Sequence, residues 1–298
     1  MENSSPAGQK LLACVALSPR VHAVAAEALA LGRALGMELS FVHAGEDSAG
    51  VRGTLEEAIR SSLAPGESMP ALHIEEGRPD DVACSVAVRV DADLIVAGAL
   101  EKEGLFEGLL GTTGRRIARS APCSVLLLPE PVDAGTRFGT IVVSTKYDDR
   151  SREMLDYVAE LARLSTARSL HIVAEFDLYG VSASNEAIPS QPGGEAPGAT
   201  WAIQERVALS SFLDSVDLHG VEVELACLEG REGTQSVEYA QTQGADLLVV
   251  PAPPRRLTVL DRFFNHPTEF ALHRLPCALL LYRHPRLEPD PAKETTSR

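Results

Sequence analysis

Glycine and threonine residues follow one buried strand in the first half of the chain, at a place suited to binding a phosphate. Four residues at or after the end of the apolar run 93–98 have this character: Gly98, Gly111, Thr112 and Thr113. Glycine lets the backbone approach a ligand closely, and the first turn of a helix offers free N–H groups. The pattern predicts an anion site, although the same residues would also serve to turn the chain and cap a helix.

Two strands and one helix must position this loop. Residues 93–98 and 124–128 are short apolar runs, which are typical of strands buried in a parallel sheet. Between them, a helix is predicted to begin at Thr112 or Thr113, whose hydroxyl groups suit an N-cap, and to end before Pro122. A strand, a glycine-containing loop and a helix in this order build ligand sites at the carboxyl ends of parallel strands.

The same pattern occurs a second time. Residues 245–282 repeat residues 92–128 at the motif ADL(I/L)V and in the helix that follows. Both copies also place a Pro-Cys pair before the last strand, with Cys123 in the first and Cys277 in the second. A repeat of this length indicates a duplicated domain, and 298 residues suffice for two α/β domains of about 150 residues each.

We therefore divide the chain into a first domain, 1–133, a second domain, 134–284, and a disordered tail, 285–298. Alternating strands and helices predict an open parallel sheet in each domain, with helices on both faces. Residues 182–200 are rich in Ser, Pro, Gly and Ala, so a flexible insert is predicted in the second domain. In the first domain, apolar periodicity predicts strands at 11–17, 38–44 and 71–75 and helices at 21–35, 54–63 and 82–90.

Composition excludes several classes of partner and location. The net charge of −15 argues against nucleic acid and against an anionic membrane surface, because both require clustered Lys and Arg. No apolar stretch approaches the length that spans a bilayer, and the N-terminus does not have the pattern of a signal peptide. Five scattered cysteines suggest neither a disulfide framework nor a metal cluster, so the cytoplasm is the expected location.

The sequence contains no set of residues that we would assign to catalysis. The chain lacks a Walker-type loop, a Gly-x-Ser-x-Gly elbow and the His-Glu-x-x-His zinc spacing. The first strand-to-helix turn contains no glycine, which excludes the dinucleotide-binding fingerprint. The histidines are not joined by metal-ligand spacing, so no metal is predicted beyond Mg²⁺ that would accompany a nucleotide.

The order of strand, ADL(I/L)V, glycine loop, helix, (A/L)PC and strand, over residues 10–283, resembles the universal stress protein family in its tandem form. The resemblance implies an open five-stranded parallel sheet in each domain, the fold called adenine-nucleotide alpha hydrolase-like. It also implies that the two domains pair within the chain around a pseudo-two-fold axis, and that two chains could form a homodimer. In many members of the family, ATP binds at the carboxyl ends of the strands.

ATP-binding members of the family have a Gly, two residues, a second Gly, nine residues, and then Gly followed by Ser or Thr. Gly98, Gly111 and Thr112 match the first, third and fourth of these positions, and Glu101 occupies the second. The resemblance therefore implies that the first domain binds ATP or a related adenine nucleotide through these matching residues and Thr113. A carboxylate at position 101 would repel the phosphates.

Two further departures from the family pattern concern the rest of the site. The family has an acidic residue at the end of its first strand, where this chain has Leu17 and Ser18 in the first domain and Thr145 in the second. In the second domain, Asn265 and His266 replace the Gly and the hydroxyl residue of the phosphate loop. The second domain is therefore predicted to have lost its nucleotide site.

Three hypotheses for the function follow. The first is a stress-associated regulatory protein that binds an adenine nucleotide in the first domain only. The alternative is a nucleotide-independent scaffold that binds an unknown protein partner through its paired sheets or through residues 182–200. The third is an enzyme on this sheet, such as a nucleotide hydrolase or an ATP-using ligase, for which the sequence offers no catalytic residues.

Overall fold

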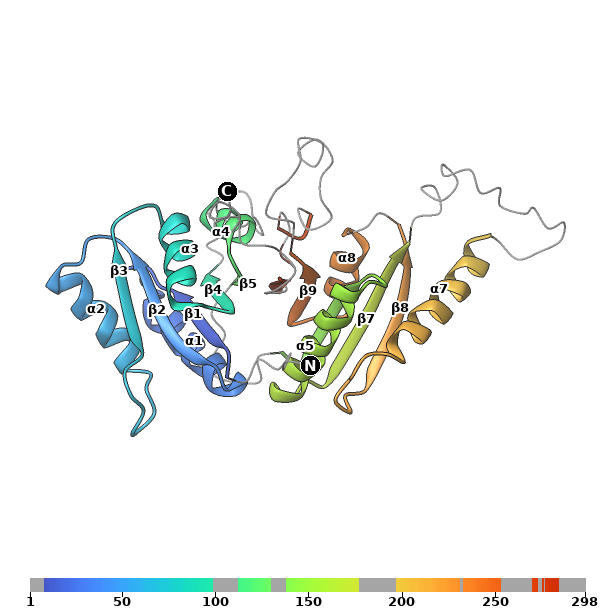
Figure 1. The fold of residues 1–298 in the computed structure, drawn as a ribbon, viewed down its shortest axis with the longest axis horizontal. Helices are drawn as coiled ribbons and strands as arrows, with labels where there is room; N and C mark the ends of the chain where they lie inside the picture. Colours follow the sequence, from blue (N-terminus) through green and yellow to red (C-terminus); the bar gives the residue numbers. More distant parts are fainter. Residues whose placement is uncertain are drawn as a thin grey trace, which may run out of the picture.

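Two α/β halves follow each other along the chain (Figure 1). The computed structural model describes residues 8–98, 112–129, 138–176, 197–230, 233–252, 270–272, 275 and 277–283. The first half contains β1 (Lys10–Cys14), α1 (Val21–Leu35), β2 (Glu38–Ala44), α2 (Ala49–Arg60), β3 (Ala71–Glu75), α3 (Pro79–Val90), β4 (Leu94–Gly98), α4 (Thr112–Ser120) and β5 (Ser124–Leu128). The second half contains β6 (Thr140–Thr145), α5 (Asp149–Leu164), β7 (Ser169–Phe176), α7 (Pro197–Leu213), β8 (Val223–Glu229), α8 (Gln235–Thr242), β9 (Leu247–Pro251) and β10 (Ala278–Tyr282).

The strands form one ten-stranded sheet in the order β3-β2-β1-β4-β5-β10-β9-β6-β7-β8. Within each half, all neighbouring strands are parallel, as in the pairing of β1 with β2 and with β4. The halves meet where β5 and β10 pair antiparallel, with Leu127 opposite Leu279. The prediction of a five-stranded parallel sheet in each domain is confirmed, and the two domains pair within the chain through their last strands.

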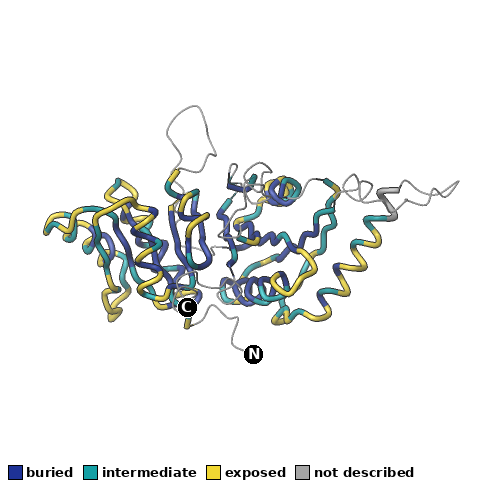
Figure 2. Tube along the Cα trace, turned by 45° about the horizontal axis from the view of Figure 1, so that its top comes forward, coloured by how far each residue is buried: buried dark blue, intermediate teal, exposed yellow. Residues whose placement is uncertain are grey.

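Helices cover both faces of the sheet, and the strands are buried between them. One buried cluster joins the sheet to α1, α2, α5 and α7, and includes Phe41 and Leu55. The other joins the sheet to α3, α4 and α8, and includes Leu12 and Val86. Figure 2 shows the buried strands within both halves and exposed residues along the outer faces of the helices. Burial of these apolar side chains is the main favourable term in folding.

The repeated ADL motif has a structural role at the start of each half. The backbone N–H of Lys10 donates to Oδ2 of Asp93 at 2.8 Å, and the backbone N–H of Thr140 donates to Oδ2 of Asp246 at 2.8 Å. Each aspartate thus holds the first residue of β1 or β6, which keeps that strand in register with β4 or β9. Burial raises the pKa of Asp93.

The boundary between the halves also carries side-chain contacts. The Oγ of Ser124, at the start of β5, accepts a hydrogen bond from the backbone N–H of Arg283 at 3.0 Å. Helix α1 of the first half also contacts α5 of the second half. The two halves are therefore joined by both the sheet and the helices beside it.

Three elements of the first half have a boundary that differs by three residues or more from the sequence prediction. The strand predicted at 11–17 ends at Cys14, although the N–H of Val15 still donates to the carbonyl of Val42 on β2 at 2.9 Å. The helix predicted at 54–63 begins at Ala49, after Ser48, whose Oγ accepts from the N–H of Val51 at 3.3 Å.

The third difference is the helix predicted at 82–90, which begins at Pro79, since proline is well suited to the first turn of a helix. In the predicted insert, residues 197–200 already belong to α7, whereas 182–196 lie outside the described residues, as does the tail 285–298. Among the residues that are described, no helix is both long and apolar enough to cross a membrane.

Candidate functional site

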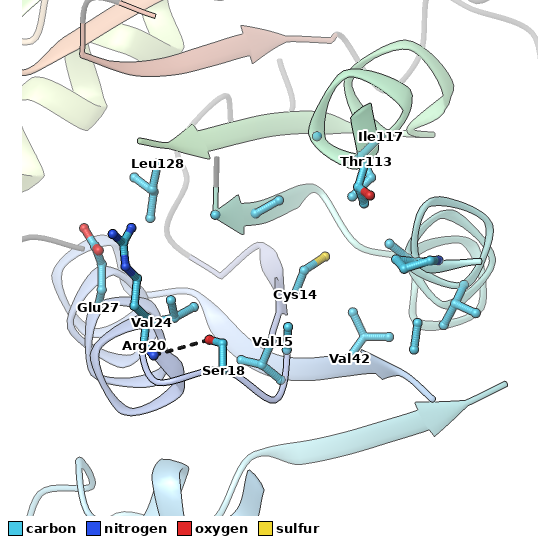
Figure 3. A pocket seen from close by; sticks show the side chains of 18 of the residues that line it. Cys14, Val15, Ser18, Arg20, Val24, Glu27, Val42, Thr113, Ile117 and Leu128 are labelled. Atoms are coloured by element: carbon cyan, nitrogen blue, oxygen red, sulfur yellow. Dashed lines mark hydrogen bonds between the residues drawn. The ribbon is translucent and has the colours of Figure 1, made fainter. Parts of the chain in front are cut away.

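The order of the strands reverses between β1 and β4, and ligands in open α/β sheets bind at the carboxyl ends of the strands at such a point. A cavity of about 370 Å³ lies there in the first half (Figure 3). Its walls come from the ends of β1, β2, β4 and β5, from the amino-terminal parts of α3 and α4, and from one face of α1. The topology therefore forms the cavity from segments that are distant in sequence.

Different residues line the two ends of the cavity. One wall is aliphatic and consists of Val42, Val82, Ala83 and Ile117, with Thr113 beside it at the start of α4. Figure 3 shows Arg20, Val24, Glu27 and Leu128 at the other end. The cavity thus offers an apolar surface in its interior and polar groups at both ends.

Three of the four predicted site residues line this cavity: Gly98, Thr112 and Thr113. Gly111 and Glu101 lie outside the described residues. No atom of the described residues lies within 4 Å of a Cβ built on Gly98. The structure thus brings the end of β4 and the first turn of α4 together in one cavity, and the role of these residues in binding a nucleotide stays a prediction.

The segment after β1 contributes no acidic residue to the cavity. Val15, Ala16 and Ser18 line it, and Leu17 is exposed at 47%. The backbone carbonyl of Val15 is already bound to Nδ1 of His43, at 3.0 Å. The wall formed by this segment is therefore largely apolar.

Sequence reasoning missed Glu27, whose side chain lines the cavity from α1. Glu27 is 2% exposed and lies on the buried face of the helix. The signal was present in the sequence, because Glu27 is the one acidic residue in an Ala- and Leu-rich helix and occupies its apolar face. Buried carboxylates are unusual enough to be candidates for function.

Two other ionisable groups near the cavity are structural. Burial raises the pKa of the Cys14 thiol to about 12, with a smaller effect from Cys84, so the thiol stays protonated and is a poor nucleophile. Burial would raise the pKa of Asp80, but its hydrogen bonds to Arg78 and to its own N–H, with the charge of Arg116, lower it. Asp80 lies 2.7 Å from Arg78 and 3.9 Å from Arg116, which links α3 to α4.

In the second half, other side chains stand at the positions that correspond to the cavity wall. Register pairs Cys14 with Val42 in the first half and Ser144 with Val173 in the second, so Ser144 corresponds to Cys14 and Glu175 corresponds to Ala44.

Glu175 accepts three hydrogen bonds where Ala44 lines a cavity. Its carboxylate oxygens lie 2.9 Å from the N–H of Gly233, 2.7 Å from the N–H of Ser236 and 3.2 Å from Oγ of Ser144. The carboxylate caps the start of α8, an interaction that the dipole of the helix favours.

Larger side chains occupy the other end of the same region in the second half. Tyr157 corresponds to Glu27, since each lies nine residues before a left-handed residue that follows its helix, Thr166 or Gly36. Tyr282, the last residue of β10, corresponds to Leu128 at the end of β5. At the end of β9, Pro251 stands where β4 ends in Gly98. Across the described residues of both halves, no three His, Cys, Asp or Glu side chains are grouped to hold a metal ion.

Comparison with known proteins agrees with this architecture. The profile of the Universal stress protein family matches residues 8–129 and 137–283. The Universal stress protein E homolog of Haemophilus influenzae is 33% identical over 54 residues, which is 18% of this chain and 18% of that protein. Universal stress protein Slr1101 of Synechocystis is 35% identical over 78 residues, which is 26% of this chain and 71% of that protein.

Solved structures of similar fold cover nearly the whole chain. A functionally unknown protein of Pseudomonas aeruginosa PAO1 aligns with a TM-score of 0.71 and 15% identity, over 95% of each chain. A universal stress protein of Archaeoglobus fulgidus aligns with a TM-score of 0.63 and 14% identity, over 96% of this chain and all of that one (100%). At these identities the likeness concerns the fold alone.

Proposed function

Because the chain belongs to the universal stress protein family, in the tandem two-domain form, we propose that it is a stress-associated regulatory protein whose first domain binds ATP or a related adenine nucleotide. The observation that carries the proposal is the cavity at the carboxyl ends of β1 and β4, into which Gly98 and the start of α4 open. Its volume of about 370 Å³ lies in the usual range for small-molecule sites.

The lining suits the two parts of a nucleotide. Val42, Val82 and Ala83 offer an aliphatic surface against which a flat base would pack. Thr112 and Thr113 stand at the first turn of α4, where free N–H groups and the helix dipole favour a phosphate. A nucleotide would bring its own Mg²⁺, which binds phosphate oxygens readily.

We propose one such site per chain, because the second half fills the corresponding region itself. Glu175 bonds to the amide groups at the start of α8, and the rings of Tyr157 and Tyr282 occupy the positions of Glu27 and Leu128. The proposal includes a cytoplasmic location, which the free state of all five cysteines supports.

The proposal is tested by calorimetric titration of the nucleotide-free protein with ATP and Mg²⁺. Gly98→Glu places a carboxylate at the cavity wall, and no atom of the described residues lies within 4 Å of the new Cβ. We expect saturable binding to the native chain and none to this variant. Gly53→Glu is the matched control, because Gly53 lies on α2 and likewise has no atom of the described residues within 4 Å of an added Cβ. This control variant should bind ATP as the native chain does.

The scaffold hypothesis is the alternative outcome of the same titration. If the native protein is folded but takes up neither ATP nor AMP, the proposed nucleotide site is wrong. The function would then depend on a protein partner or on pairing of two chains. Catalysis by a cavity thiol is disfavoured in either case, because burial raises the pKa of Cys14 to about 12.

A further inference from the structure

We propose that His43 is a positioning residue for the ligand of the first domain, and that it turns the backbone N–H of Ala16 toward the cavity as a hydrogen-bond donor. The inference rests on the proposed function and adds a binding group to the same site. Nδ1 of His43 lies 3.0 Å from the carbonyl oxygen of Val15. His43 is the last residue but one of β2 and is 8% exposed.

The contact between His43 and Val15 has a defined polarity. A carbonyl oxygen only accepts hydrogen bonds, so Nδ1 carries a hydrogen and donates to Val15. The ring is also enclosed on its other side, since a Cβ built on Gly45 would lie 2.7 Å from Nε2. The N–H of Gly45 is itself held, because it donates to the carbonyl of Glu75 at 2.9 Å. The ring that fixes the direction of the Val15 carbonyl is therefore tightly packed.

The Val15 carbonyl shares a planar peptide group with the N–H of Ala16. In a trans peptide these two groups point in opposite directions, and the described residues contain no cis peptide bond. With the carbonyl turned to His43 on β2, the Ala16 N–H points away from β2, to the side of β1 on which β4 lies. Ala16 lines the cavity, and its N–H donates to no other group in the described part of the chain. This N–H can therefore donate to an acceptor atom of the ligand.

The imidazole acts on the cavity from behind its wall. Val42 and Ala44 line the cavity, so His43 between them points to the opposite face of the sheet, because side chains alternate along a strand. The segment after β1 has three residues in the wall: Val15, Ala16 and Ser18. The N–H of Val15 donates to the carbonyl of Val42 at 2.9 Å, so the bond from His43 is a second tie between this segment and β2.

The second half has no imidazole at this place. By the strand register, Ala174 corresponds to His43 and Thr145 corresponds to Val15. Thr145 and Ala174 pair with each other as a continuation of the ladder between β6 and β7. In the first half β1 ends one residue earlier, and the Val15 carbonyl bonds to the His43 ring. The fold therefore forms without a histidine at this position, and the histidine occurs in the half that has the cavity.

The test is calorimetric titration of ATP and Mg²⁺ into the native chain, His43→Leu and His43→Asn. Leucine removes the donor to the Val15 carbonyl, so we expect ATP to bind about fivefold more weakly, as for the loss of one hydrogen bond. The side-chain N–H of asparagine lies near the position of Nδ1, so His43→Asn should bind ATP nearly as tightly as the native chain. Titration measures the dissociation constant separately from the number of sites, and partial unfolding of a variant would lower only the number of sites.

His171→Leu is the matched control, because His171 is also a buried histidine, 4% exposed, and its Nδ1 lies 3.1 Å from Oη of Tyr239 in the second half. This variant should have the native dissociation constant. An unchanged dissociation constant in His43→Leu would overturn the inference alone, as would an equal weakening in His43→Asn or in His171→Leu. Absence of ATP binding to the native chain would overturn the proposed function and the inference with it.

Discussion

The first and second halves of the chain share a fold and differ in what occupies the carboxyl ends of their strands. In the first half, Ala44 and Cys14 border a cavity of about 370 Å³. In the second half, Glu175 and Ser144 hold the corresponding positions and bond to each other at 3.2 Å. The first half thus has a cavity at the place where the second half has the carboxylate of Glu175.

The difference shows that the side chains at the carboxyl ends of the strands can change without any change of fold. Both halves have the strand order 3-2-1-4-5, and both anchor their first strand through the aspartate of the ADL motif. The N–H groups of Gly233 and Ser236, at the start of α8, already donate to the Glu175 carboxylate. A ligand that bound to these N–H groups would have to displace this side chain. We expect the stability of the second half to depend less on a bound ligand than the stability of the first half does.

The largest effect is expected from Glu175→Ala. The substitution leaves the N–H groups of Gly233 and Ser236 without their acceptor, so it should lower the free energy of unfolding by about 3 kcal/mol. Urea denaturation measures the change. Glu229→Ala, at an exposed position on the neighbouring strand β8, is the control and should have little effect. Equal destabilisation by both variants would show that Glu175 has no special role.

Alkylation of Cys14 tests how far the thiol that lines the cavity of the first half is protected by burial. Because burial raises the pKa of its thiol to about 12, the thiolate is scarce at pH 8.5 and becomes common only as the pH approaches that value. Iodoacetamide should therefore modify Cys14 at least about a hundredfold more slowly in the folded protein than in urea. Peptide mass spectrometry follows the reaction, and equal rates in the two states would contradict the burial.

Filling the first cavity should make it resemble the second. Ala44→Leu adds apolar volume at the cavity wall, so we expect ATP to bind more than about tenfold more weakly while thermal stability stays nearly the same. Ala71→Leu, on the exposed side of β3, is the control for the added volume and should bind ATP as the native chain does. Unchanged affinity in Ala44→Leu would place the ligand elsewhere.

The smallest effect is expected at Ser236. Its hydroxyl is fully buried and has no hydrogen-bond partner in the described part of the chain, and the first half has Ala83 at the same position, eleven residues before its next strand. Ser236→Ala should therefore stabilise the protein by about 1 kcal/mol, measured as a higher urea midpoint. The exposed Ser210→Ala should not, and a loss of stability in Ser236→Ala would reveal a partner for the hydroxyl.

The elements with strong local signals could be predicted from the sequence. Helix α1 matches its predicted range, since its apolar face is regular and Gly36 ends it with a φ of 64°. Strands β2 and β3 also match, because each is a short segment with apolar residues between turns. The start of α2 was missed because Gly50 and Gly53 lower its helix propensity, although Ser48 caps it.

The residues of the candidate site were harder to predict from the sequence than the helices and strands. The places of Gly98 at the end of a strand and of Thr112 at the start of a helix could be predicted from their spacing, because a strand, a loop and a helix have a local pattern. For Glu27 the sequence signalled only an acidic residue on an apolar helix face, and for Glu175 it gave no signal, because each lies in a region assembled from distant strands and helices. That Glu175 corresponds to Ala44 follows only from the strand register, which the spacing of the ADL motifs does not give.

The most direct test of the account is to count the nucleotides bound by each chain. Native mass spectrometry of the purified protein in the presence of excess ATP and Mg²⁺ gives this number without any mutation. We predict one nucleotide per chain, lost in Gly98→Glu and retained in Gly53→Glu. Two nucleotides per chain would contradict the closure of the second half by Glu175, and none would contradict the nucleotide site in the first half.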